Sequence, residues 1–246
     1  MKTFKARGVV LRDVSVGESD KIVTLLLKGR GKLGASARGA RKSNSQFLAA
    51  AQLFTYSDFV ITQGKNYFAI TQADVIETFY GLGDSYERLI AASRAVKLCD
   101  RVILEQEPCD DILHLLIYSL NALCKDRPPE LVEAAFLLKF LQYSGFGPDF
   151  ETCSLCGKVV TFQDAGKLGQ FPAGLHGITC AACAGSANQA IRMWLAESTR
   201  QAAVYIVNSD VRNLFSFEAV PQVLVQLSEY GDFMLREHFD TTVNNN

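Results

Sequence analysis

The chain has 246 residues, 48% of them hydrophobic, which allows one large domain or two to three small ones with buried cores. No apolar run approaches the roughly 18 residues of a membrane span, and the N-terminal Met-Lys-Thr-Phe-Lys has no apolar signal core. We therefore expect a cytoplasmic protein whose seven cysteines are reduced.

The net charge of −1 hides an uneven distribution. Residues 1–42 hold eleven Lys or Arg and three acidic residues, a net of +8, whereas residues 43–246 hold 14 basic and 23 acidic residues, a net of −9. Such a separation predicts a polyanion as the partner of the first part of the chain.

The first 76 residues show a β pattern. Strands are predicted at 6–11, 21–27, 32–37, 54–61 and 67–75, with a glycine-containing turn at 28–31. Five short strands in about 70 residues predict a small OB-like barrel over residues 1–79, although an SH3-like barrel would have nearly the same pattern.

A basic segment, residues 38–47, separates the third and fourth predicted strands. It has no periodicity, and we expect it to be mobile when free. With the adjacent turn it predicts a cationic rim that binds phosphates without reading base sequence. A merely solvated loop is the alternative. The candidate phosphate contacts are Lys28, Arg30, Lys32, Arg38, Arg41 and Lys42.

Aromatic residues of the barrel could also stack on bases of a single strand. Most of them should instead belong to the barrel core, and the pattern does not single out any one. The aromatic residues in question are Phe47, Phe54, Tyr56, Phe59, Tyr67 and Phe68.

Residues 80–246 are predicted to be mainly helical. The first helix should start at a cap on Asp84 or Ser85 and reach about residue 105, and Asp110 should cap the second. Pro128-Pro129 should precede a third helix at 130–143. Later helices are expected at 188–197, around Trp194, and at 218–238, whereas residues 204–207 are an ambiguous apolar run. The fold class is therefore α+β.

Two Cys-x-x-Cys pairs, Cys153/Cys156 and Cys180/Cys183, are separated by 23 residues. This arrangement predicts one structural Zn²⁺ with four thiolate ligands in a segment at about 150–185 inserted in the helical part. The glycines between the pairs favour a hairpin and loop there. His176 could replace a cysteine, but four thiolates already complete a tetrahedron and leave no position for a substrate. Two disulfides or a redox dithiol fit less well. A thioredoxin-like dithiol needs one pair inside a βαβ pattern, which is absent here, and disulfides are rare in the reducing compartment expected for this chain.

The order of parts resembles the bacterial RecO family of recombination-repair proteins over nearly the full length. The specific matches are Ala-Arg-Gly-Ala-Arg-Lys at 37–42, Gly-Phe-Gly-Pro at 145–148 before the first cysteine pair, and Arg-Glu-His-Phe at 236–239. The resemblance implies a non-enzymatic, nucleoid-associated mediator that binds single- and double-stranded DNA and anneals complementary strands. It also implies three partners: RecR, the acidic tail of single-strand-binding protein, and RecA, which is loaded onto DNA.

The sequence leaves one alternative function open. A zinc-containing interaction adaptor could use the basic segment to bind an acidic protein instead of DNA. No membrane association is expected, because no apolar run is long enough to span a bilayer. No small-molecule substrate is expected, because the sequence lacks phosphate-binding loops and nucleophile motifs.

Overall fold

The computed structural model describes residues 2–160, 169–172, 177–184 and 191–239. The chain folds into two compact units, residues 1–129 and residues 130–246. Among the described helices, none combines the length and the apolar character that crossing a membrane requires.

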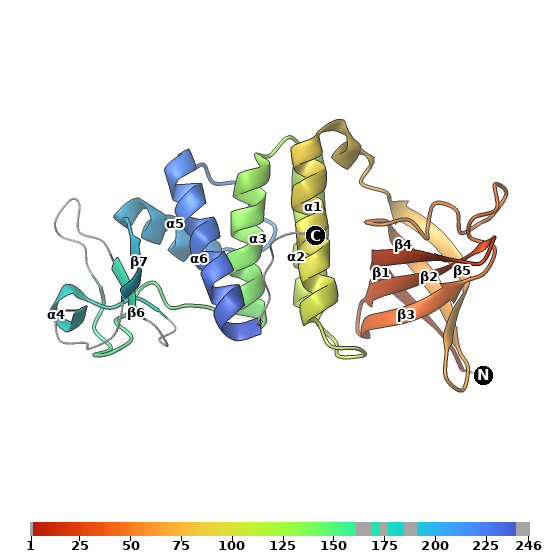
Figure 1. Ribbon diagram of the computed structural model, residues 1–246, viewed down its shortest axis with the longest axis horizontal. Coiled ribbons are helices and arrows are strands. Elements are labelled where there is room, and N and C mark those ends of the chain that lie inside the picture. The colour runs from red at the N-terminus through yellow and green to blue at the C-terminus, as the bar shows by residue number, and fades with distance from the viewer. Residues whose placement is uncertain (1, 161–168, 173–176, 185–190, 240–246) are drawn as a thin grey trace. The chain divides into compact units, whose positions relative to one another are not determined.

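The first unit begins with a closed five-stranded barrel (Figure 1). Its strands are β1 (Lys2–Val16), β2 (Asp20–Leu27), β3 (Gly31–Ala37), β4 (Tyr56–Gln63) and β5 (Phe68–Glu77). They pair in the order β1-β2-β3-β5-β4, and β4 closes onto β1. Only β3 and β5 are parallel; the other pairs are antiparallel. This arrangement confirms the prediction of an α+β fold with an OB-like barrel.

Strand β1 is longer than the six residues predicted for it. Residues 2–9 pair with β4 and residues 8–16 pair with β2, so one strand serves two neighbours. Its two ends carry exposed polar and charged residues, which give little apolar signal. Only the buried middle of the strand, Gly8 to Leu11, has the composition of a core strand.

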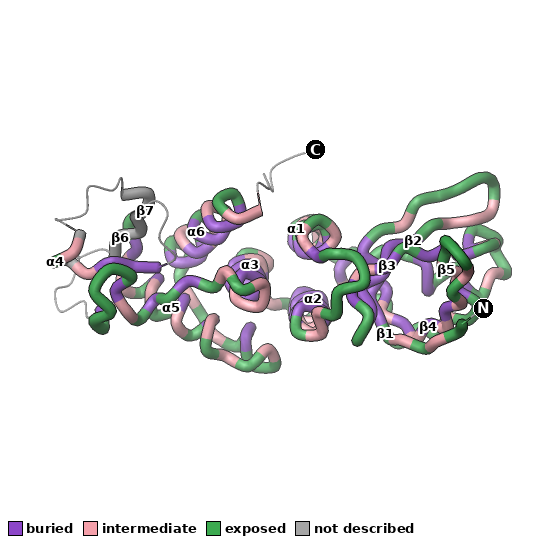
Figure 2. The backbone as a smooth tube through the Cα atoms, turned by 90° about the horizontal axis from the view of Figure 1, so that it is seen from below, coloured by how far each residue is buried: buried purple, intermediate pink, exposed green. Residues whose placement is uncertain are grey.

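Buried residues alternate with more exposed ones along β3 and β4, and the buried ones belong to the barrel core. Figure 2 colours the backbone by this burial. The connection between β3 and β4 also contributes to this core through Ala40, Phe47, Ala50 and Ala51. These apolar residues fix residues 38–55 as a series of turns on the barrel. The segment therefore differs from the mobile loop that its local sequence predicted.

A short 3-10 helix, η1 (Tyr80–Asp84), leads from the barrel to α1 (Tyr86–Val102) and α2 (Asp110–Cys124), which lie side by side (Figure 2). Ser85 caps α1 by accepting a hydrogen bond from the Arg88 N–H, as predicted. Asp110 is the first residue of α2 and not its cap. Its carboxylate instead accepts a 2.6 Å hydrogen bond from the Gly29 N–H in the β2–β3 turn.

The second unit contains α3 (Pro129–Tyr143), α5 (Glu197–Asn208) and α6 (Pro221–Phe239). Helix α3 is buried along almost its whole length, as expected for a helix that is apolar on every face. Helix α6 approaches it closely at Gly231, where a Cβ atom would lie 2.4 Å from the side chain of Leu137. The predicted helices at 130–143 and 218–238 correspond to α3 and α6.

A two-stranded antiparallel sheet in the same unit joins β6 (Gly169–Pro172) to β7 (Ile191–Leu195), and the short helix α4 (Ala181–Ala184) lies between them in the chain. The helix predicted at 188–197 is therefore wrong. Residues 191–195 form a strand because a partner about 20 residues earlier pairs with them, and local periodicity cannot show such a partner. The ambiguous run at 204–207 belongs to α5.

Candidate metal centre and nucleic-acid interface

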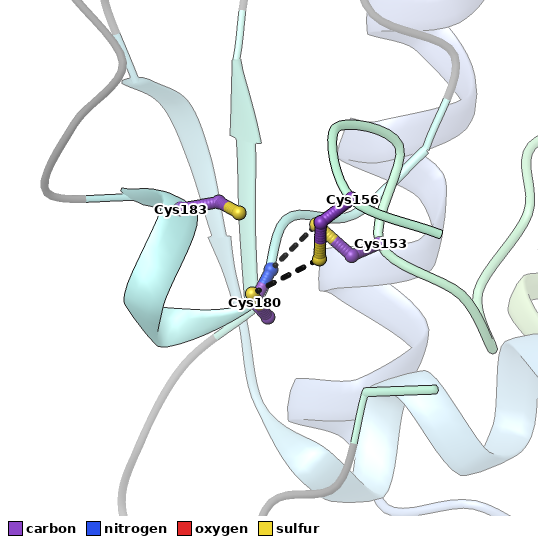
Figure 3. Close-up of side chains that lie close together, drawn as sticks. All are labelled: Cys153, Cys156, Cys180 and Cys183. Carbon is purple, nitrogen blue, oxygen red and sulfur yellow. Dashed lines mark hydrogen bonds between the residues drawn. The ribbon is translucent and has the colours of Figure 1, made fainter. Parts of the chain in front are cut away.

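The four predicted ligands, Cys153, Cys156, Cys180 and Cys183, converge (Figure 3). Their sulfur atoms all lie within 4.8 Å of one another, and the sulfurs of Cys156 and Cys180 are 3.8 Å apart. Two thiolates bound at about 2.3 Å in a tetrahedron around one Zn²⁺ would themselves be about 3.8 Å apart. The cluster could therefore hold one metal ion, and its dimensions fit a four-thiolate site. His176 lies outside the described residues.

Each cysteine pair is part of a local turn. In the first pair the Cys153 N–H donates to the Lys158 carbonyl at 2.8 Å, and the Gly157 N–H donates to the Cys153 carbonyl at 2.8 Å. Gly157 has φ 70°, a left-handed conformation that favours glycine. In the second pair the Cys183 N–H donates to the Cys180 carbonyl at 3.0 Å, within the first turn of α4.

Hydrogen bonds between the two turns hold them at one centre. The Ser154 N–H donates to the Ile178 carbonyl at 2.9 Å. The Cys180 N–H donates to the sulfur of Cys153 at 3.3 Å, which is the kind of contact that orients a metal-binding thiolate (Figure 3).

The cysteine thiols of the cluster differ in pKa. Burial raises the pKa of Cys153, but N–H donors of Cys180, Cys156 and Leu155 outweigh it and lower that pKa to about 6. Side-chain hydrogen bonds with Cys180 and Cys156 raise the pKa of Cys183 to about 12, so it stays a thiol beside a neighbouring thiolate. If all four cysteines bound as thiolates, four negative charges would share this small volume, and a divalent metal would neutralise their repulsion.

The candidate DNA contacts fall into two groups instead of one rim. The distal group consists of Arg38, Arg41 and Lys42, which follow β3 and are all exposed. The turn group consists of Lys28, Arg30 and Lys32 at the start of the same strand. Because a strand advances about 3.3 Å per residue, Lys32 in the turn group and Arg38 in the distal group, six residues apart along β3, are separated by roughly 20 Å.

The distal group is held against the β1–β2 turn. Arg41 donates from its backbone N–H to Ser19 at 2.9 Å and from its guanidinium to the Gly17 carbonyl at 3.0 Å. The Asp20 carboxylate accepts a 2.8 Å hydrogen bond from the Gly39 N–H. This contact and the Ser19 hydroxyl lower the pKa of Asp20, with smaller contributions from nearby Arg38 and Lys42. Local patterns did not predict Asp20, because its partner is 19 residues away.

The turn group has an acidic neighbour, Asp100, in helix α1. Lys32 is only 14% exposed; its ammonium group contacts the Asp100 carbonyl and lies 3.8 Å from the Asp100 carboxylate. Arg30 lies over the ring of Phe4, 4.2 Å from its centre. Lys28 is exposed, and its backbone N–H donates to the Arg7 carbonyl at 2.8 Å.

The candidate stacking aromatics also fall into two groups, one buried and one at least partly exposed. Phe47, Phe54 and Phe59 are buried, as expected for core residues. Tyr67 is 47% exposed, and Tyr56 and Phe68 are half-buried. The surface of the barrel therefore offers few aromatic rings to a nucleic acid.

The sequence matches two family models in tandem. The model described as "Recombination protein O N terminal" matches residues 1–79, and the one described as "Recombination protein O C terminal" matches residues 83–244.

Three curated relatives, each named "DNA repair protein RecO", illustrate the similarity. The protein from Acetivibrio thermocellus is 34% identical over 241 residues, covering 98% of this chain and 93% of its own. That from Alkaliphilus metalliredigens is 29% identical over 238 residues, covering 96% and 94%. That from Caldicellulosiruptor saccharolyticus is 36% identical over 174 residues, covering 68% and 71%.

Proposed function

This chain belongs to the RecO family of DNA repair and recombination proteins, and from that premise we propose that it is a non-enzymatic mediator that binds single- and double-stranded DNA and anneals complementary strands. The proposed DNA-binding domain is the barrel, residues 1–79. Residues 80–246, with the metal segment 150–185 inserted, are proposed to form the helical domain that docks partners.

The observation that carries this proposal is the distal group of cations. Arg38, Arg41 and Lys42 are exposed, and the turn that bears them is anchored to the β1–β2 connection. Side chains that start from a fixed backbone lose less conformational freedom when they bind phosphates than those of a mobile loop. Their cationic groups bind phosphates by releasing counterions, and they need no particular base sequence.

Annealing follows from the same charges. Two DNA strands repel each other, and a group of cations that contacts both lowers that repulsion while the bases pair. Only electrostatic screening is required, so the proposal includes no bond-breaking step. The four-thiolate donor set agrees with this, because a complete tetrahedron has no position for a substrate.

The proposed partners are RecR, the acidic tail of single-strand-binding protein, and RecA, which the protein would help to load onto DNA. Support for these partners comes from family membership. Zn²⁺ is the proposed metal, and its role is structural. Cys153, Cys156, Cys180 and Cys183 would hold it, and it would supply the cross-link between the two turns.

The salt dependence of binding tests the DNA contacts. We expect affinity for single-stranded DNA to fall linearly with the logarithm of salt, with a slope of about −0.7 per phosphate contact. Replacing Arg38, Arg41 and Lys42 by Ala should flatten that slope by about one to two units.

The matched control removes three cations from outside the barrel, at Lys97, Lys158 and Arg212, each of which is exposed. This control variant has the same net charge as the first and should keep the original slope. Equal slopes for the wild type and the Arg38, Arg41, Lys42 variant would exclude the distal group from the DNA site.

The adaptor alternative makes a different prediction. If the basic segment binds an acidic protein segment only, single-stranded DNA should not shift in a native gel even at low salt. A shift that disappears with the distal-group substitutions rejects the adaptor.

A further inference from the structure

A pocket of about 210 Å³ lies beside the β2–β3 turn of the barrel. Its volume exceeds the cavity of about 150 Å³ that accommodates benzene in another protein. It is therefore large enough for a planar ring bigger than benzene. The lining side chains that matter here are Phe4, Arg30, Leu33, Gln63, Phe68 and Gln106.

The apolar side of the pocket is aromatic. Phe4 and Phe68 are half-buried against the barrel core, and their rings meet edge to face with centres 6.5 Å apart. The guanidinium carbon of Arg30 lies over the Phe4 ring, 4.2 Å from its centre. Planar rings and a guanidinium plane are the surfaces on which nucleobases stack.

Gln63 and Gln106 also line the pocket, and each has a carboxamide side chain. Each carboxamide has both donors and an acceptor, the combination that pairs with a base edge. Gln106 adopts φ 59°, a left-handed conformation that is uncommon for a residue with a side chain. Its N–H donates to the Lys32 carbonyl at 2.9 Å, which fixes this residue of the α1–α2 connection beside the barrel.

Carboxylates near the pocket partly offset the turn-group cations Lys28, Arg30 and Lys32 and so reduce the attraction for a phosphate there. The α1–α2 connection carries Glu105 and Glu107, both exposed, and Asp110 binds the neighbouring Gly29 N–H. These carboxylates would oppose a phosphate at this end of the barrel. An uncharged base meets no such opposition.

We propose that this pocket binds one unpaired nucleobase of single-stranded DNA, stacked on the Phe4 and Arg30 planes with its edge toward the two carboxamides. The inference rests on the proposed function and refines it: Arg30 contacts a base, and phosphate binding is left to the distal group. The bases of double-stranded DNA are paired, so we expect that duplex DNA does not bind in this pocket.

The test compares two oligonucleotides of equal length and charge, oligo(dT) and an abasic analogue with the same phosphodiester backbone, by fluorescence anisotropy. The wild-type chain should bind oligo(dT) at least about fivefold more tightly, the lower end of what stacking of one base contributes. Arg30→Lys keeps the charge and loses the planar group, and Phe4→Leu keeps an apolar side chain and loses the ring. Either substitution should reduce the preference toward one.

A distal-group variant, with Arg41 and Lys42 replaced by Ala, serves as the control. It should weaken binding of both oligonucleotides by a similar factor and keep the preference. A direct localisation uses wild-type protein and 5-iododeoxyuridine in the oligonucleotide: ultraviolet cross-links should form in peptides that contain Phe4 or Phe68.

The outcomes separate the two proposals. Equal affinity of the wild type for the two oligonucleotides overturns the base pocket and leaves DNA binding intact. So does a preference that survives both pocket substitutions, or cross-links found only elsewhere. Absence of binding to both oligonucleotides overturns the proposed function and, with it, the pocket.

Discussion

Arg200 connects α5 to the chain segment that enters the metal centre. Its guanidinium forms two 2.8 Å hydrogen bonds with the Glu197 carboxylate and a 3.1 Å hydrogen bond with the Phe150 carbonyl, three residues before Cys153. Glu197 is the first residue of α5, where the helix dipole also favours a negative charge. The pair thus positions the first cysteine turn from outside the ligand set.

The pH dependence of the unfolding free energy should reveal the contribution of the Glu197–Arg200 ion pair. Hydrogen bonding to Arg200 lowers the pKa of Glu197 below its ordinary 4.5, although burial opposes the shift. A carboxylate with a lowered folded-state pKa contributes its full stability above 4.5 and loses it as the pH falls through the folded pKa. We expect Glu197→Gln to cost about 0.5–1 kcal/mol near neutral pH in urea unfolding, and the difference from wild type to shrink in acid.

Asp210→Asn provides the control for that experiment. Asp210 and Arg212 are 3.9 Å apart and mostly exposed, so its loss should change stability little at any pH. A constant difference between Glu197→Gln and wild type across the acid range would contradict the role assigned to the ion pair.

At the scale of elements, the α1–α2 connection is packed directly onto β3. The closest approach is at Gly31, which has φ 68° and where a Cβ atom would lie 2.0 Å from the Glu107 carbonyl oxygen. The contacts of Lys32 with residues 105 and 106 continue the same interface. A side chain at position 31 would therefore force two backbones apart.

Gly31→Ala tests how much this packing contributes. We expect a loss of about 2–4 kcal/mol in unfolding free energy, from the left-handed backbone and the backbone clash. Gly34→Ala in the same strand is the matched control, because no atom lies within 4 Å of its Cβ position and its φ is not left-handed. If the two variants melted at the same temperature, the close contact at Gly31 would not be required.

At the scale of the whole molecule, the excess of basic residues and the candidate metal site lie in different compact units. Residues 1–129 hold 18 basic and 14 acidic residues, and residues 130–246 hold 7 basic and 12 acidic residues. The cations proposed to bind DNA are all in the first unit, and the four cysteines are all in the second. Loss of metal should therefore affect one unit and spare the other.

Metal removal can be followed separately in the two units. We expect about one Zn²⁺ per chain, and its chelation should increase hydrogen exchange around residues 149–183 because metal binding there contributes to folding. Exchange in the barrel strands and single-strand DNA affinity should change little. Cys180→Ser should reproduce the effect, whereas Cys124→Ser, outside the cluster, should retain the metal. A metal-free chain with unchanged protection at 149–183 would show that the cluster needs no ion.

Patterns in the amino-acid sequence were enough to predict the features that depend on short-range interactions. Cys-x-x-Cys pairs specify tight turns, Ser85 specifies a helix start, and alternation specifies most barrel strands, because each involves neighbours within a few residues. The uneven charge is likewise a property of the chain.

The contacts between residues far apart in the chain became known only from the three-dimensional fold. It separated the six candidate cations into two groups, turned residues 191–195 into a strand, and gave Asp110 a partner in the barrel. It also brought Gln106 beside Phe4 and Arg30. These outcomes depend on backbone hydrogen bonds and packing between segments far apart in the chain, for which a local pattern carries no signal.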